Sequence, residues 1–143
     1  MIPRFLPVLA LALVLFAAAC GGDGDIPEDA RVLQIGAVAE EATYAYAGGG
    51  PAGLYAYLAP DVRARCSPQQ FEQALAGQLV PTGFRGLKKV RFEDEAARVT
   101  LVWIAAQGDT DVEWVFVPNP EGAGAAGPSW YLREVPGIEG CGG

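Results

Sequence analysis

Histidine is absent from this chain of 143 residues. Its absence excludes a serine or cysteine nucleophile paired with a histidine base, a histidine-ligated zinc ion, and the side chain that most often acts as an acid or base near neutral pH. Basic residues are also scarce, with ten against 17 acidic ones. So acidic a chain does not follow a phosphate backbone without a local basic patch, and we expect no nucleic-acid partner.

One basic cluster is present, comprising Arg85, Lys88, Lys89 and Arg91. At alternating strand positions its members fall on both faces of a strand. This pattern favours a solvated edge strand whose basic side chains hinder pairing with another chain.

Cysteine occurs only three times, and Cys20 is the most informative. It follows an apolar run over residues 5–19 that ends in three alanines, and Arg4 gives the start of the chain a positive charge. This arrangement resembles a bacterial lipoprotein signal peptide. The resemblance implies cleavage before Cys20, a lipid on its thiol, and attachment to the extracytoplasmic face of the cell membrane.

Two alternatives for this segment remain open. An uncleaved transmembrane anchor is one, although fifteen apolar residues rise only about 22 Å as a helix, short of the roughly 30 Å hydrocarbon core. An ordinary signal peptide with a free Cys20 is the other, since Ala17 stands where lipoproteins usually have leucine.

Cleavage would divide the chain into a signal peptide (1–19), a Gly- and Asp-rich tether (20–26) and a single domain (27–143). The 124 residues that remain are enough for one hydrophobic core and too few for two. Without Arg4, nine basic residues stand against 17 acidic ones, a formal charge of −8.

A lipid on Cys20 would leave Cys66 and Cys141 as the remaining pair. Two cysteines in an exported domain favour one disulfide, although two separate buried thiols are the alternative. No C-x-x-C pair indicates a redox site.

Helical signals come first in the domain. We expect a helix over 27–47 with an apolar stripe, a short helix over 52–58, a further turn begun by Asp61 and ending near Cys66, and a helix capped by Ser67 that ends near Gly77. The stripe comprises Val32, Ile35, Val38, Ala39 and Ala42, with Tyr46 near the helix end.

The period changes to two after Pro81, which predicts strands. We expect a first long strand around Val90 and Phe92, two further strands joined by a turn at Gly108-Asp109, a loop over 118–128 and a last strand over 129–134. The inward positions are Val99, Leu101, Trp103 and Ala105, then Val112, Trp114 and Phe116, and finally Trp130 and Leu132, with Tyr131 and Arg133 outward. The fold class is therefore α+β, with N-terminal helices packed on a curved antiparallel sheet.

Three segments carry a further resemblance: residues 54–63 (Leu-Tyr-Ala-Tyr-Leu-Ala-Pro-Asp-Val-Arg), the capped helix with Phe71, and the strand Trp130-Tyr131-Leu132. Over about residues 28–136 the chain resembles the NTF2-like (SnoaL-like) superfamily. The resemblance implies a cone-shaped domain that encloses a pocket, a scaffold used by enzymes, binding modules and dimerisation domains alike.

Familiar motifs are excluded by their context. Residues 122–127 spell G-x-G-x-x-G, but Pro128 and a strand follow where a nucleotide-binding helix should begin. Residues 109–113 begin like a calcium loop, but Trp114 occupies the position that needs glycine. Glu40 and Glu41 are adjacent on a helix, so they do not face each other. We therefore expect no metal and no cofactor.

Aromatic side chains form the one possible ligand-binding group. Trp103, Trp114, Phe116 and Trp130 are expected on the inner face, with Tyr44 or Tyr46 approaching from the first helix. Our interpretation is that they mainly fill the core, and a ligand pocket is the alternative.

Taken together, these patterns predict a lipid-anchored, extracytoplasmic domain that serves as a non-catalytic binding or interaction module with a protein partner or a second copy. The alternatives are an isomerase- or dehydratase-type enzyme that uses the cone pocket, and a structural dimerisation domain whose contact is the open side of the sheet.

Overall fold

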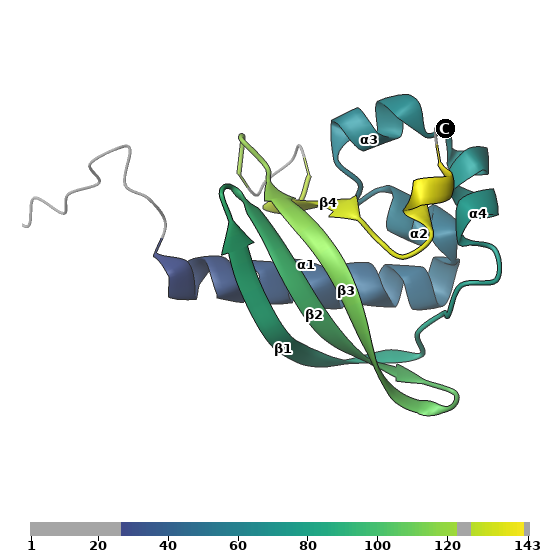
Figure 1. Cartoon of the computed structure of the whole chain (residues 1–143), viewed down its shortest axis with the longest axis horizontal. Helices are drawn as coiled ribbons and strands as arrows, with labels where there is room; N and C mark the ends of the chain where they lie inside the picture. Colours follow the sequence, from purple (N-terminus) through teal and green to yellow (C-terminus); the bar gives the residue numbers. More distant parts are fainter. Residues whose placement is uncertain (1–26, 123–126, 142–143) are drawn as a thin grey trace, which may run out of the picture.

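Helices precede an antiparallel sheet in this fold, as the change of period along the sequence predicts. The structure, a computed structural model, describes residues 27–122 and 127–141. Figure 1 shows the long helix α1 lying across one face of the sheet, with three short helices near its C-terminal end. The elements are α1 (Glu28–Gly49), α2 (Pro51–Tyr55), α3 (Pro60–Arg65), α4 (Pro68–Leu75), β1 (Gly83–Glu93), β2 (Ala96–Ala105), β3 (Gly108–Pro118), β4 (Trp130–Glu134) and the 3₁₀ turn η1 (Ile138–Gly140).

A capping box begins α4. Ser67 Oγ accepts a hydrogen bond from the backbone N–H of Gln70 at 3.2 Å, and Gln70 Oε1 accepts one from the N–H of Ser67 at 2.8 Å. The predicted helix start is therefore confirmed, because both otherwise unpaired donors are satisfied by side chains.

The second helix is shorter than predicted. The sequence predicts a helix over residues 52–58, but α2 ends at Tyr55. The backbone N–H of Ala59 donates to the Leu132 carbonyl at 2.8 Å, and the N–H of Leu132 donates to the Tyr57 carbonyl at 2.8 Å. Because these groups are bonded to β4, they cannot also continue a helix. A long-range contact therefore ends α2 early.

The four strands of the described sheet form a meander in the order β1-β2-β3-β4. β1 lies at an edge, as the basic cluster predicts. The predicted turn at Gly108-Asp109 is wrong, because Ala105 pairs with Gly108 and residues 106–107 make the turn. The observed β2–β3 pairing is shifted by an even number of residues from the pairing that a turn at Gly108-Asp109 would give. Every side chain therefore keeps its face of the sheet, and the alternation of apolar residues does not distinguish the two pairings.

The inner face of the sheet packs against α1 to make the core. Every predicted inward position of β2 and β3 is buried, as are the α1 residues Ile35, Val38, Ala39, Ala42 and Tyr46. Tyr44 is 50 % exposed, so Tyr46 is the α1 tyrosine that reaches the core.

Tyr131 departs from its predicted outward, solvated position. Trp130 and Leu132 are buried and Arg133 is exposed, as predicted, but Tyr131 is only 9 % exposed. Residues 59–61 and 117–121 line the same hollow as Tyr131. The start of α3 and the end of β3, with the residues that follow it, therefore flank Tyr131 on this side of β4.

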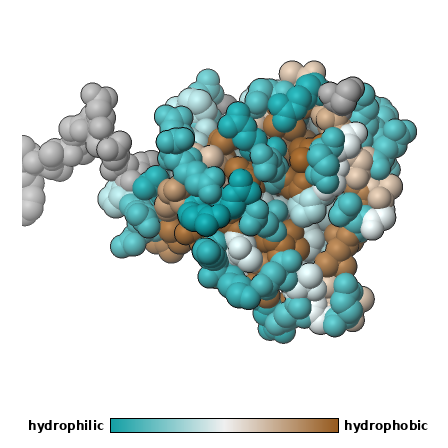
Figure 2. Space-filling model, in the orientation of Figure 1, coloured by the Kyte–Doolittle hydropathy of each residue, from teal (hydrophilic) through white to brown (hydrophobic). Residues whose placement is uncertain are grey.

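Ion pairs cover the outer face of the sheet. They are Arg85 Nε–Asp109 Oδ1 at 3.3 Å, Lys88 Nζ–Asp111 Oδ2 at 2.6 Å and Arg98 Nη1–Glu113 Oε1 at 2.7 Å. Arg85 and Lys88 sit where the register between β1 and β2 shifts, and an irregularity of this kind redirects a side chain. The side chains of Arg85 and Lys88 therefore reach the same face of the sheet. This corrects the expectation that the basic cluster divides between the two faces of its strand. Figure 2 shows hydrophilic residues over much of this side.

Candidate ligand pocket

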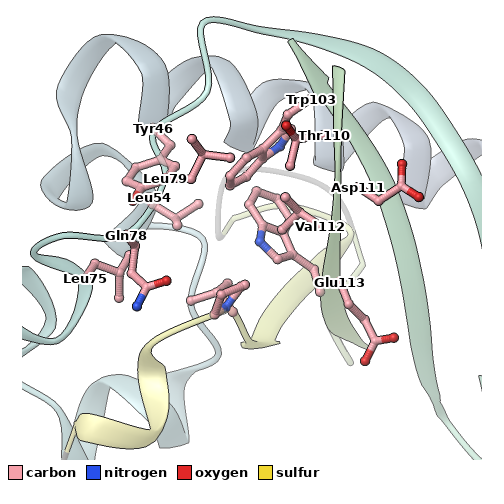
Figure 3. Close-up of a pocket in the computed structure, with 13 residues that line it drawn as sticks. Tyr46, Leu54, Leu75, Gln78, Leu79, Trp103, Thr110, Asp111, Val112 and Glu113 are labelled. Atoms are coloured by element: carbon pink, nitrogen blue, oxygen red, sulfur yellow. The ribbon is translucent and has the colours of Figure 1, made fainter. Parts of the chain in front are cut away.

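A cavity of about 250 Å³ lies between the inner face of the sheet and the helical layer. Its wall comes from β2 and β3 on one side, from α1, α2 and α4 on the other, and from the segment after β4 (Figure 3). The buried lining residues are Tyr46, Leu54, Leu75, Trp103, Val112, Trp114 and Val135. The more exposed ones, toward solvent, are Gln78, Leu79, Thr110, Asp111, Glu113 and Pro136.

Three aromatic side chains, Tyr46, Trp103 and Trp114, form what we call the aromatic wall of this cavity. The ring centroids of Tyr46 and Trp103 are 5.9 Å apart, and those of Trp103 and Trp114 are 5.6 Å apart in an edge-on arrangement. These are separations at which aromatic pairs stabilise one another. The structure thus brings together three of the five aromatic residues proposed from the sequence.

Phe116 and Trp130, the other two, are buried elsewhere in the core and do not line this cavity. The Phe116 ring packs against Trp114 at 6.0 Å. The indole N–H of Trp130 donates to Gln34 Oε1 at 3.1 Å, which ties β4 to α1. Phe116 therefore packs behind the aromatic wall, and Trp130 joins β4 to α1 away from the cavity.

Two of the three indole N–H groups have a hydrogen-bond partner among the described residues, and one has none. Trp103 donates to Thr43 Oγ1 at 3.1 Å, and Trp130 donates to Gln34. Trp114 Nε1 is buried and has no hydrogen-bond partner among the described residues. A buried donor left unpaired costs about 1 to 3 kcal/mol, so the indole N–H of Trp114 lowers the stability of the fold unless an acceptor is bound.

Charged groups of the lining point away from the cavity. Asp111 and Glu113 occupy outward positions of β3, where they pair with Lys88 and Arg98. Figure 3 shows both carboxylates directed away from the aromatic wall. Burial raises the pKa of the Tyr46 hydroxyl above its usual value of 10.0, so this group stays protonated at neutral pH. The cavity therefore offers aromatic surface and hydrogen-bond donors rather than a general base.

The C-terminal segment supplies Val135 and Pro136 to the lining. Gly137 follows with φ of 94°, and a Cβ at this position would lie 2.9 Å from the Ala74 carbonyl oxygen, so glycine permits the close approach to the end of α4. A disulfide joins Cys66 to Cys141, with their Cα atoms 5.5 Å apart. The predicted disulfide is confirmed, and it fixes the segment that follows β4.

The other residues singled out in the sequence lie elsewhere. Cys20 and part of the glycine-rich segment 122–127 lie outside the described residues. Asp61 pairs with Arg65 at 3.9 Å and with Arg133 at 3.7 Å, so it joins α3 to β4. Residues 109–113 lie in β3, as the strand interpretation requires.

The described part of the chain contains neither a metal-binding cluster nor a membrane-spanning helix. Across residues 27–122 and 127–141, no group of three or more cysteine, aspartate or glutamate side chains is placed to hold a metal ion. None of the helices in these ranges combines the length and the apolar character needed to cross a membrane.

On the helical side of the cavity, the sequence indicates Tyr46 but not the other lining residues. Leu54, Leu75 and Val135 were not proposed as lining residues, and they come from a short helix, the end of another helix and an irregular segment. The apolar character of these residues indicated burial, but no local pattern indicates which buried residues border a cavity.

Comparisons of this chain with protein-family models, with curated proteins and with solved structures gave no match.

Proposed function

We propose that this chain is a lipid-anchored, extracytoplasmic lipoprotein whose NTF2-like domain is a non-catalytic binding module for a small, largely apolar molecule. Support for the anchor is the apolar segment that ends at Cys20. Support for the NTF2-like assignment is the packing of N-terminal helices on an antiparallel sheet with a cavity between the two layers.

The cavity is the observation that carries the binding proposal. An apolar cavity of about 150 Å³ is large enough to hold benzene, so about 250 Å³ suits a molecule of one or two rings. Natural ligand sites combine a mostly apolar lining with a few polar groups that orient the ligand. The aromatic wall, Leu54 and Leu75 provide the apolar lining, and Trp114 Nε1 is a candidate for the polar group that orients the ligand.

Chemistry of the lining favours binding over catalysis. An isomerase or dehydratase requires a positioned base, and the carboxylates near this cavity are held outward in ion pairs. The outer face of the sheet is also a poor dimer contact, because its charged side chains would have to be desolvated. We therefore favour the binding module over the two alternatives.

A pair of matched variants tests the proposal. Val112 and Val115 are both buried residues of β3, but Val112 lines the cavity and Val115 lies on the opposite face. Val112→Phe fills the cavity, whereas Val115→Phe makes the same change of volume elsewhere. Naphthalene serves as the probe, titrated into the purified full-length protein and followed by tryptophan fluorescence.

We expect saturable binding to the parent and to Val115→Phe, and at least about tenfold weaker binding to Val112→Phe, a difference of about 1.4 kcal/mol. Partition of naphthalene into detergent is the same for all three proteins, so it cancels in the comparison. Absence of saturable binding to the parent, or equal binding to both variants, would show that the cavity is not a ligand site.

A further inference from the structure

Trp114 gives the strongest indication of which ligand the cavity accepts, and this inference rests on the function proposed above. Its side chain is fully buried, lines the cavity and is packed edge-on against Trp103. More than about 90 % of buried polar groups in native proteins are hydrogen-bonded, so an unpaired indole N–H calls for an explanation.

For the other two tryptophans, the fold supplies a hydrogen-bond acceptor to the indole N–H. Thr43 accepts from Trp103 and Gln34 accepts from Trp130, and both acceptors come from α1. No described side chain performs this role for Trp114. Since Trp114 lines the cavity, the missing acceptor is best supplied by a molecule bound there.

Charge and shape narrow the chemical class further. An anion would be repelled by the carboxylates of Asp111 and Glu113 near the opening, and no lysine or arginine is among the lining residues to attract it. A cation could contact the faces of the aromatic rings, but it would be repelled by the N–H of Trp114 and would leave that donor without an acceptor. A flat ring suits the aromatic wall, because offset and edge-on ring contacts are favourable.

We propose that the ligand is a neutral, planar molecule of one or two rings that carries a ring nitrogen or a carbonyl oxygen, and that this atom accepts the hydrogen bond of Trp114 Nε1. Because Nε1 is buried, the acceptor reaches it only when the ligand moves neighbouring lining side chains apart. The hydrogen bond then selects this class from apolar molecules of equal size.

Quinoline and naphthalene form a matched pair of probes, since they differ by one ring nitrogen that accepts a hydrogen bond. At mildly alkaline pH, where quinoline is uncharged, we expect the parent to bind quinoline about tenfold more tightly than naphthalene, after correction for partition of each probe. Trp114→Phe should lose this preference, because phenylalanine keeps an aromatic ring but has no N–H. Trp130→Phe should keep it, because Trp130 does not line the cavity.

A second measurement does not depend on how well Trp114→Phe folds. In the ¹⁵N-labelled parent, quinoline should shift the indole N–H resonance of Trp114 downfield, and naphthalene should not. Equal affinity for the two probes, or a preference that survives in Trp114→Phe, overturns this inference and leaves the binding function standing. Failure of both probes to bind the parent overturns the binding function and the inference with it.

Discussion

The indole N–H of Trp103 donates a hydrogen bond to the hydroxyl of Thr43 at 3.1 Å, and both side chains are buried. This bond crosses the core between β2 and α1 and fixes the orientation of an indole in the aromatic wall. Thr43 is the buried polar side chain on the inward face of α1. Its position in an otherwise apolar stripe is explained by the donor that it satisfies.

Replacement of Thr43 by valine should destabilise the protein. Valine has nearly the same shape and helix propensity as threonine, so the main change is an unpaired Trp103 N–H. We expect the free energy of unfolding in urea to fall by about 1 to 3 kcal/mol. Thr43→Ser keeps the hydroxyl and should cost clearly less than Thr43→Val. If the valine variant is as stable as the parent, the bond contributes nothing measurable.

Much of the fold follows from local patterns. The period of two placed the inward residues of β2 and β3 correctly, and Ser67 with Gln70 marked the start of α4. The errors have tertiary causes. The backbone of residues 57–59 is bonded to β4, which shortened α2, and an even shift of register moved the turn to residues 106–107 without exposing any inward side chain.

The candidate pocket was predictable only in part. Trp103 and Trp114 follow from strand alternation, and Tyr46 follows from the apolar stripe of α1. The contribution of Leu75, Val135 and other residues depends on how α4 and the C-terminal segment pack, which no local pattern specifies. Likewise, the three tryptophans are equivalent in the sequence, and only the packing of α1 shows that Trp114 lacks an acceptor.

The Cys66–Cys141 disulfide should stabilise both the fold and the cavity. The cysteines are 75 residues apart in sequence, and loss of a bond that closes a loop of this length typically costs 2 to 5 kcal/mol. We expect the double variant Cys66→Ala, Cys141→Ala to unfold at lower urea concentration and to bind naphthalene several-fold more weakly, because Val135 and Pro136 lose their nearby tether.

Cys20→Ala provides the control for that experiment, since it removes a cysteine but leaves the disulfide intact. It should match the parent in unfolding free energy and in probe affinity. Unchanged probe affinity in the double variant, measured where that variant is folded, would show that the disulfide does not hold the cavity wall.

Tyr46 should make the protein sensitive to alkali. Burial raises the pKa of its hydroxyl above the unfolded value of 10.0, so folding favours the protonated form. Below pH about 10 this contribution to stability is constant, and as the pH rises through the raised pKa it is lost, because only the unfolded chain ionises freely.

The free energy of unfolding, measured between pH about 9 and about 11, should therefore fall less steeply in Tyr46→Phe than in the parent. Tyr44→Phe is the control, because it makes the same substitution at a half-exposed residue of the same helix. Tyr57, whose pKa is raised by burial and secondly by Glu41, accounts for part of the slope that remains. Identical slopes in the parent and Tyr46→Phe would contradict this assignment.

Acylation of Cys20 is the prediction on which the proposed location depends. Mass spectrometry of the membrane-extracted protein should find a chain that begins at Cys20 and carries lipid on that residue. A single acyl chain gives only marginal membrane binding, so we expect the several chains that stable anchoring requires. Cys20→Ser should shift the protein from the membrane fraction to the soluble fraction, while the mutation of Cys66 and Cys141 should not. An unmodified Cys20, or a mature chain that still begins at Met1, would rule out the lipoprotein assignment.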